Sequence, residues 1–404
     1  MSARNIVIIG GGQASAVATR TLRRRGYDAG ITIVGDEAER PYQRPPLSKE
    51  YLTAADESGL FLLPEDWTEA HDVDLRTGVR ATKISAADGS VLLEDGTMLP
   101  ADRVLLATGG SPRRLPDTHG DRILYLRTKA DAARLREHVR PGARVIVIGA
   151  GFIGAEVASS ARILGAEVTV LEAAPVPLAR VLGLCVGEAC AQMHVDAGVD
   201  LRLDTQVETV RQIGDEVVVS TSSGDVVGDV VVVGIGIVPN DEVARASGID
   251  VDNGVLVDAH CRSSMEHVYA AGDVANHYHP LFKTRMRVEH FDNANKQAAA
   301  AANNMIGRET IFDDPHWFWS DQFGRNLQYV GHAAPTDQVV IRGDIGEPSW
   351  SAFYLRDGGI RAAFAVDNPE DIMVARELIS ARVEIDAARL GDSGGDLMEL
   401  LEEL

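Results

Sequence analysis

Short apolar runs that end in glycine alternate with helical patterns in the first part of the chain. Residues 6–9 are all apolar, glycines follow at 10–12, and residues 13–26 then carry apolar side chains at helical spacing. A continuous apolar run is typical of a strand buried on both faces of a parallel sheet. The next strand-like run, "ITIVGDE", completes the order strand, turn, helix, strand, which predicts a βαβ unit.

The same pattern begins again near residue 143. "RVIVIGAG" precedes the helical pattern "FIGAEVASSARILG" and the strand-like "EVTVLE", so we expect a second βαβ unit that duplicates the first. Further strand-like runs lie in "RVLLATGG", "DVVVVGIGIVPN" and "HVYAAGDVANH", and "FDNANKQAAAAANNMIG" predicts a helix. After about residue 315 aromatic residues cluster and alternating strand patterns follow, which predicts an antiparallel α+β module.

These patterns predict an α/β fold with two Rossmann-like nucleotide-binding domains and a C-terminal α+β domain. We expect a discontinuous first domain at residues 1–112 and 239–315, a second at 113–238 and the third at 316–404. The length of 404 residues agrees with two or three domains.

Composition narrows the possible functions. The formal net charge of −21 disfavours bulk attraction to nucleic acid or to an anionic membrane. No apolar stretch approaches the roughly 18 residues of a membrane span and no export signal is evident, so we expect a cytoplasmic protein. The three cysteines are too few for a disulfide framework and show no zinc-type spacing, so we expect no metal site.

The first glycine turn is a dinucleotide-binding fingerprint. Gly10 permits a tight turn, Gly12 allows the backbone to approach a pyrophosphate, and Ser15 stands where glycine or alanine is usual. The N-terminus of the following helix supplies N–H groups for the phosphates. Asp36, or its neighbour Glu37, would accept hydrogen bonds from the adenosine ribose. The alternative is an ordinary glycine-rich turn.

The second fingerprint has glycine at all three small positions, Gly149, Gly151 and Gly154. Glu172 ends the next strand, where an acid accepts from a ribose 2′-OH and repels a 2′-phosphate, so NADH is favoured over NADPH. Arg180 follows closely enough in sequence that binding of NADPH stays an alternative. Glu172 could instead be a solvated acid on the surface.

The acid in "YAAGDVAN" suggests that the two sites hold different cofactors. Asp273 follows a buried strand and Gly272, which places it at the carboxyl edge of a sheet, where ligands bind. There it can accept hydrogen bonds from the ribityl chain of a flavin. Its alternative role is the N-cap of a helix.

Taken together, "RPPLSK", "LLATGG", the two fingerprints, "VGIGIVPN", "YAAGDVAN" and "FWSDQF" resemble the motif set of NADH-dependent ferredoxin reductases. This putidaredoxin-reductase-like family comprises the FAD-containing reductase components of bacterial oxygenase and cytochrome P450 systems. The resemblance covers nearly the whole chain and implies a glutathione-reductase-like arrangement of the two nucleotide domains. The chain resembles rubredoxin reductases and apoptosis-inducing factor more distantly.

The resemblance also implies site residues. The residues expected to bind FAD include the three small residues of the first fingerprint. They are Gly10, Gly12, Ser15, Asp36, Glu37, Arg44, Lys49, Ala107, Thr108, Gly109, Gly272, Asp273, Val274, Glu289 and His290. Those expected to bind NADH are Gly149, Gly151, Ile153, Gly154, Glu156, Glu172, Arg180 and Gly236. Trp319 matches an aromatic residue next to the flavin or the nicotinamide.

Three of these residues are expected to act on the reaction itself. Lys49, on a proline-stiffened loop, would favour the electron-rich reduced flavin. Glu156 needs a partner if it is buried, and Lys49 is the natural one. Trp319 can cover a ring face. The alternatives are that Lys49 is a solvated lysine, that Glu156 is an exposed helix residue and that Trp319 is a core tryptophan.

Cysteine placement argues against disulfide reductases of the same architecture, because "PYQRPPLSK" contains no redox cysteine pair. Cys185 and Cys190 follow the second fingerprint, where we expect them to pack on a helix.

We therefore expect hydride transfer from NADH to FAD, followed by single-electron transfer to a small acidic [2Fe–2S] ferredoxin that supplies a P450 or ring-hydroxylating oxygenase. The alternatives are a rubredoxin reductase and a slow NADH-oxidising flavoprotein with a signalling role. Monomer and homodimer both remain open. An acidic partner implies a basic surface patch, for which the candidates are Lys283, Arg285, Arg287, Arg308 and Arg342.

Overall fold

The computed structural model describes residues 4–402 and divides into two compact units. Unit 1 comprises Met1–Gln43, Glu57–Ser111 and Ile237–His316, and unit 2 comprises Arg44–Asp56, Pro112–Gly236 and Trp317–Leu404. Unit 2 thus holds most of the predicted second domain together with the predicted C-terminal domain. The predicted boundaries between three domains stay a prediction.

Unit 1 is built on a five-stranded parallel sheet with the strand order β19-β7-β1-β2-β3. Its strands are β1 (Asn5–Ile9), β2 (Gly30–Val34), β3 (Val73–Arg76), β7 (Arg103–Leu106) and β19 (Val268–Ala270). Side chains alternate along β1, so that Ile6 and Ile8 enter one core while Val7 and Ile9 enter the other. The predicted fully buried strand is confirmed.

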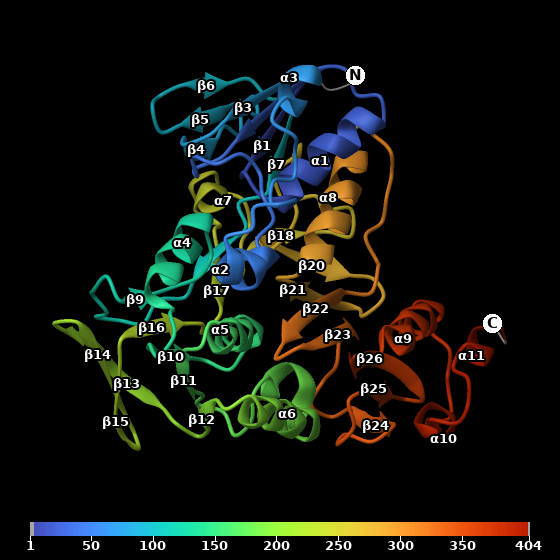
Figure 1. Cartoon of the computed structure of the whole chain (residues 1–404). Helices are drawn as coiled ribbons and strands as arrows, with labels where there is room; N and C mark the ends of the chain where they lie inside the picture. Colours follow the sequence, from blue (N-terminus) through green and yellow to red (C-terminus); the bar gives the residue numbers. More distant parts are fainter. Residues whose placement is uncertain (1–3, 403–404) are drawn as a thin grey trace. The chain divides into compact units, whose positions relative to one another are not determined.

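Each face of this sheet is covered by a different layer. Helices α1 (Gln13–Arg24) and α8 (Phe291–Met305) cover one face and lie side by side, in blue and orange in Figure 1. Small alanines such as Ala18 and Ala298 line this core and allow the close approach. The antiparallel strands β4 (Ala81–Ile84), β5 (Val91–Leu93) and β6 (Met98–Leu99) contribute to the core on the other face.

The remaining elements of unit 1 are short. They are α3 (Trp67–Ala70), β8 (Gly110–Pro112), whose last residue belongs to unit 2, β17 (Ile237–Pro239), α7 (Glu242–Ala246), β18 (Val255–Val257), β20 (Ala275–His279) and β21 (Thr284–Arg287). β20 pairs in parallel with β18 and antiparallel with β21.

Unit 2 repeats the same plan and confirms the expected duplication of the βαβ unit. Its parallel sheet has the order β12-β11-β10-β16-β9. The strands are β9 (Ile123–Leu124), β10 (Arg144–Ile148), β11 (Glu167–Leu171), β12 (Asp200–Arg202) and β16 (Val230–Val233). Val145 and Val147 of β10 pack with helix α5 (Phe152–Ile163), while Ile146 and Ile148 pack with an antiparallel sheet. That sheet consists of β13 (Val207–Ile213), β14 (Glu216–Thr221) and β15 (Gly224–Gly228).

Three further helical segments belong to this part of unit 2. The proline loop forms a 3-10 turn, η1 (Pro45–Ser48), and continues as α2 (Glu50–Ala54), as predicted for a loop that enters a short helix. Helix α4 (Lys129–His138) begins with a capping box at Thr128. Helix α6 (Ala179–Asp196) has a kink at Gly183, where φ is +75°.

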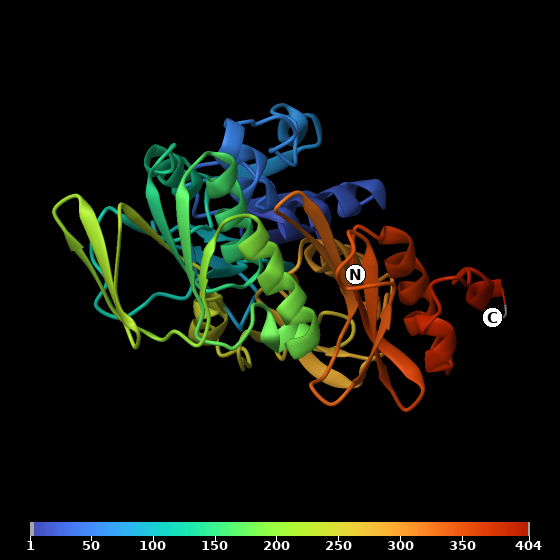
Figure 2. The ribbon, with the colours of Figure 1, turned by 60° about the horizontal axis from the view of Figure 1, so that its bottom comes forward.

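The C-terminal part of unit 2 is α+β, as predicted. Its antiparallel sheet has the order β22-β23-β26-β25-β24, and α9 packs on it (Figure 2). The elements are β22 (Trp317–Gln322), β23 (Arg325–Gly331), β24 (Gln338–Arg342), β25 (Trp350–Arg356), β26 (Gly359–Val366), α9 (Pro369–Ala381), α10 (Ala387–Gly391) and α11 (Glu399–Glu402).

Helix α6 shares its apolar core with this sheet. Cys190 is 1% exposed there and packs in the same cluster as Phe318 and Phe364, as expected for a packing cysteine. Cys185 is exposed, so the expectation that both cysteines pack is wrong for Cys185. Among the residues from 4 to 402, no helix is long and apolar enough to cross a membrane.

Candidate functional site

The turn from β1 into α1 has the geometry that a bound pyrophosphate requires. Gly10 has φ +124°, and a Cβ there would lie 2.1 Å from the carbonyl oxygen of Ala107, so only glycine fits. At Gly12, the N-cap of α1, a Cβ would meet no atom within 4 Å. No side chain caps this helix and its first turn contains no acid, so the N–H groups and the positive dipole end remain available to an anion.

Ser15 fits the third small position because its hydroxyl is satisfied locally. The side chain is fully buried, and Oγ donates a hydrogen bond of 2.5 Å to the carbonyl oxygen of Gly10. The hydroxyl therefore ties the helix back to the turn.

Of the two acids after β2, Asp36 is the better placed to bind a ligand. Its carboxylate is exposed and pairs with Arg80 at 3.2 Å across the surface. Glu37 instead accepts a hydrogen bond from the hydroxyl of Tyr42. An exposed surface pair contributes little, so Asp36 can exchange Arg80 for another donor at low cost.

The segment around Asp273 lies at the carboxyl end of β19. Gly272 has φ +80°, and its N–H donates to Oε1 of Gln297 at 2.9 Å. Asp273 is partly exposed, whereas Val274 is fully buried. The alternative role of Asp273 as a helix N-cap is wrong, because strand β20 follows it rather than a helix.

Two neighbouring segments complete this edge of unit 1. In the Ala107–Gly109 turn, the Thr108 hydroxyl donates to the Asn240 carbonyl at 2.6 Å, and the Asn240 amide donates back to the Thr108 carbonyl at 2.9 Å. His290 is the N-cap residue of α8, and burial lowers its pKa to about 4 although Asp273 acts in the opposite direction. Glu289 pairs with Arg287 at 2.7 Å.

The turn from β10 into α5 has the same geometry. A Cβ at Gly149 (φ +99°) would lie 2.4 Å from the carbonyl oxygen of Gly234. A Cβ at Gly154 would lie 2.0 Å from the carbonyl oxygen of Gly149, whereas Gly151 again faces open space. Helix α5 has no side-chain cap and no acid in its first turn, so its N-terminus also suits a phosphate.

Glu172 is bound to this second turn rather than solvated. Its Oε2 accepts from the N–H of Ala150 at 2.6 Å, and its Oε1 accepts from the N–H of Ala174 at 2.8 Å. The reading as a free surface acid is therefore wrong. Ile153, Arg180 and Gly236, also expected to bind NADH, are exposed.

A buried ion pair lies within unit 2 beside this helix. Lys49 Nζ is 3.0 Å from Oε1 of Glu156, and the two side chains are only 11% and 4% exposed. The contact predicted for these two residues is confirmed, and the readings as a solvated lysine and an exposed helix glutamate are wrong.

Two serines that the sequence reasoning missed orient the Glu156 carboxylate. Ser48 Oγ donates to Oε2 at 2.5 Å, and Ser320 Oγ donates to Oε1 at 2.7 Å. Ser48 directly precedes Lys49, and Ser320 directly follows Trp319. The one feature of the sequence that could have pointed to these serines is that each is next to a predicted site residue. Each carboxylate oxygen of Glu156 thus accepts a hydrogen bond from a serine hydroxyl.

Trp319 lies next to this pair and is not a core tryptophan. Its ring is partly exposed, its centroid is 5.8 Å from the Lys49 ammonium, and it stacks on Trp317 at 5.4 Å. A partly exposed flat ring beside a cation is a surface on which another ring can stack. Arg44 lies in the same unit and donates to the carbonyl oxygen of Arg127 at 2.7 Å.

Two of the five candidates for a basic patch are used inside the fold. Arg287 is 8% exposed and donates to the carbonyl of Asp273, and Arg342 is 11% exposed and pairs with Asp371 at 3.4 Å. Including them in a docking patch was wrong. The exposed candidates are Lys283, Arg285 and Arg308.

Comparison with known proteins agrees with this geometry. A family model described as pyridine nucleotide-disulphide oxidoreductase matches residues 4–298, and one described as reductase C-terminal matches residues 317–401. The chain is 42% identical over 397 residues to the anthranilate 1,2-dioxygenase system ferredoxin–NAD(+) reductase component of Burkholderia cepacia, covering 97% of this chain and 98% of that protein. It is 35% identical over 407 residues to putidaredoxin reductase CamA of Pseudomonas putida, covering 98% and 96%.

Among solved structures, the crystal structure of the covalent putidaredoxin reductase–putidaredoxin complex matches with a TM-score of 0.96. The identity is 35%, and the match covers 99% of this chain and 98% of that chain. These matches confirm the fold class expected from the sequence.

Proposed function

Because the chain belongs to the pyridine nucleotide-disulphide oxidoreductase family, we propose that it is an FAD-containing reductase that takes a hydride from NADH and passes electrons one at a time to a ferredoxin. Its relatives are named as ferredoxin–NAD(+) reductase components and as putidaredoxin reductase, which confirms the expected enzyme class, activity and cofactors. The acidic [2Fe–2S] nature of the partner, the oligomeric state and the cytoplasmic location stay predictions.

The observation that carries this proposal is the pair of equivalent glycine turns. Each has an open N-cap glycine, a helix N-terminus without an acid, and a strand-end carboxylate. The residues present therefore suit two dinucleotides. When bound, FAD supplies the redox chemistry, since it accepts a hydride and releases electrons singly.

In unit 1, the N–H groups at the start of α1 bind the FAD pyrophosphate and Asp36 accepts from the ribose hydroxyls. Asp273 accepts from the ribityl chain, and Gln297 holds the backbone before it through the Gly272 N–H. Val274 is buried, so it contributes through its backbone.

In unit 2, the start of α5 binds the pyrophosphate of NADH. Glu172 exchanges its backbone N–H partners for the 2′-OH of the ribose, and its charge repels the 2′-phosphate of NADPH. The exposed Arg180 is the second residue of helix α6 and is the residue that would weaken this preference.

The Lys49–Glu156 pair keeps a cation fixed in position. Two hydroxyls and the ammonium orient the Glu156 carboxylate, and the carboxylate in turn restricts Lys49. A fixed positive charge favours an electron-rich ring without reorganisation during the reaction. We propose that Lys49 acts in this way on the reduced flavin, with Trp319 as a stacking surface.

The proposal is tested by cytochrome c reduction with NADH, with and without a panel of [2Fe–2S] ferredoxins and a rubredoxin. We expect strong stimulation by at least one ferredoxin and much slower reduction with NADPH. Greater stimulation by the rubredoxin identifies a rubredoxin reductase instead. Slow NADH oxidation with no stimulation by any carrier contradicts the proposal and favours the signalling alternative.

A further inference from the structure

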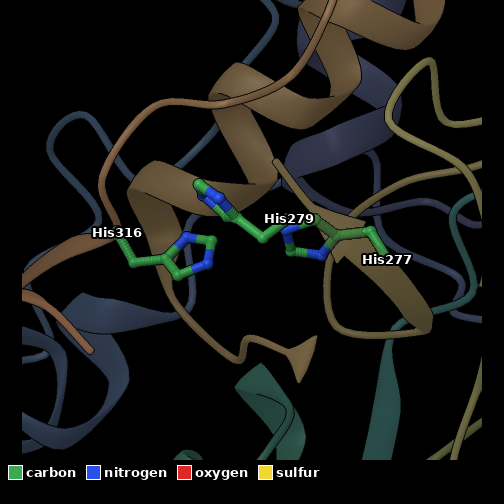
Figure 3. Close-up of side chains that lie close together, drawn as sticks. All are labelled: His277, His279 and His316. Atoms are coloured by element: carbon green, nitrogen blue, oxygen red, sulfur yellow. The ribbon is translucent and has the colours of Figure 1, made fainter. Parts of the chain in front are cut away.

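Three buried histidines of unit 1 lie close together. His277 and His279 occupy alternate positions on β20, and His316 directly precedes β22 (Figure 3). Their side chains are 0%, 0% and 3% exposed. One ring nitrogen from each lies within 4.8 Å of the others, a spacing that one bound metal ion can bridge.

The imidazole ring of His277 is buried without the hydrogen bonds that its nitrogens could make. Neither of its ring nitrogens makes a hydrogen bond of normal geometry, although the ring is fully buried. Buried polar groups are almost always satisfied, so two such nitrogens on one ring call for an explanation. A bound metal ion would satisfy one of these nitrogens, because imidazole is a common metal ligand through either ring nitrogen.

The other two rings are held in orientations that suit ligation. His279 Nε2 lies 3.0 Å from the carbonyl oxygen of Asp314, a contact that fixes the proton on Nε2 and leaves the lone pair on Nδ1. His316 Nε2 lies 2.9 Å from the thioether sulfur of Met286, which is itself buried. A soft sulfur atom is thus part of the same cluster.

The surroundings determine which ion the cluster suits. Phe312 lies 5.1 Å from the His277 ring and Phe282 lies 4.6 Å from the His279 ring, so the walls are apolar. Within the described residues, this cluster includes no Asp, Glu or Cys. Imidazole suits both zinc and copper, whereas a thioether is a soft ligand that favours Cu(I), so the Met286 sulfur beside His316 shifts the preference towards Cu(I). Because the Born cost of burial rises with the square of the charge, a divalent ion without an anionic ligand costs about four times as much.

We propose that His277, His279 and His316, with Met286 beside them, form a binding site for one Cu(I) ion. The site joins the β20–β21 hairpin to the segment that leads into β22. It includes none of the residues proposed to bind NADH or FAD, and it does not depend on the proposed function. Sequence spacing does not indicate this site, because His316 is distant from the other two histidines along the chain.

The site is tested on the purified FAD-loaded protein under anaerobic conditions, by titration with Cu(I) in competition with bicinchoninate. We expect one Cu(I) per chain, and His316→Phe and His277→Phe each to weaken binding by at least about tenfold, since each removes a ligand. His119→Phe changes an exposed histidine and is the matched control, expected to bind as the wild type does. Flavin absorbance and far-UV circular dichroism establish that each variant is folded.

Two results overturn the proposal: no Cu(I) binding by the wild-type protein, or binding that the folded His316→Phe variant retains in full. If His277→Phe does not fold, His316→Phe decides alone. A parallel titration with Zn²⁺ alone tests the choice of ion, and tighter binding of Zn²⁺ than of Cu(I) contradicts it. X-ray absorption of the Cu(I) form is expected to show nitrogen ligands, with one sulfur if Met286 joins them.

Discussion

In unit 1 the chain turns from β1 into α1 at Gly10, and in unit 2 it turns from β10 into α5 at Gly149. Both glycines have a positive φ, and at both a Cβ would collide with a carbonyl oxygen of a neighbouring strand end. Both sheets carry helices on one face and a three-stranded antiparallel sheet on the other. The shared framework fixes two sites of the same kind, so the differences between the cofactors must lie in side chains.

The two sites differ at two equivalent positions and in the acids that follow their second strands. Ser15 replaces Gly154 and ties α1 to its turn through a hydroxyl. Asp36 lies one residue farther past its strand than Glu172 does, and it is exposed, whereas Glu172 is bound to backbone N–H groups. Val17 stands where Glu156 stands in the second turn, and only the second helix carries a buried carboxylate. Duplication thus supplies the binding frame, and substitutions on it give each site its chemistry.

The largest expected effect comes from Lys49→Met, which leaves the Glu156 carboxylate buried without its cation. Removing one partner of a buried pair costs about 3–5 kcal/mol, so the urea midpoint of unfolding falls sharply. The double variant Lys49→Met/Glu156→Gln recovers most of the loss. Val17→Met, at the equivalent position of the first helix, changes the midpoint little. Equal midpoints for Lys49→Met and the wild type would show that the pair is solvated.

A second prediction compares the third small positions. Gly154→Ala places a Cβ 2.0 Å from the carbonyl oxygen of Gly149, and such overpacking costs about 1–3 kcal/mol. We expect a lower melting temperature and a raised KM for NADH with the flavin retained. Ser15→Ala loses only one hydrogen bond, about 1 kcal/mol. If both variants behave alike, the two helices approach their turns equally closely and the comparison fails.

The third prediction concerns the strand-end acids. A charged group contributes about 1.5–3 kcal/mol through its hydrogen bonds, so Glu172→Arg is expected to shift the NADH-to-NADPH ratio of kcat/KM by about 10–100-fold towards NADPH. Glu167→Arg introduces the same charge change at the start of the same strand and is the control. Asp36→Asn is expected to weaken flavin retention and leave the ratio unchanged. An unchanged ratio in Glu172→Arg would remove Glu172 from ribose recognition.

The smallest expected effect is a pH dependence at the edge of unit 1. Burial lowers the pKa of His290 from 6.5 to about 4, so the unfolded chain binds the proton more readily than the folded chain does. The free energy of unfolding therefore falls as the pH drops below 6.5, by about 1 kcal/mol down to about pH 5.5, and the loss ends near pH 4. His290→Phe should flatten this slope in urea titrations, and the exposed His119→Phe should not. If the free energy of unfolding depends on pH equally in both variants, His290 is solvated in the folded protein and its burial does not cause the effect.

The sequence predicts features that depend on local pattern and fails where distant segments meet. The two βαβ units follow from apolar runs and glycines, and the Lys49–Glu156 contact follows from the cost of an unpaired buried charge. Ser48, Ser320 and Gln297 were missed because a hydroxyl or an amide becomes informative only when its partner is known. The helix N-cap remained an alternative for Asp273 because the local sequence does not distinguish an Asp that precedes a strand from one that precedes a helix. The histidine cluster combines a hairpin strand with a connector, which no spacing rule identifies.

The central claim, that the first turn holds FAD and the second holds NADH, is tested most directly by placing a carboxylate in each open N-cap position. Gly12→Asp and Gly151→Asp introduce the same charge beside the two helix N-termini, where no atom lies within 4 Å of the new Cβ. The measurement is the flavin absorbance of each purified variant and its anaerobic bleaching by NADH in a stopped-flow instrument. We predict that Gly12→Asp is colourless, whereas Gly151→Asp is yellow and is bleached at least about 100-fold more slowly than the wild type. A yellow Gly12→Asp variant, or a Gly151→Asp variant bleached at the wild-type rate, would contradict the account.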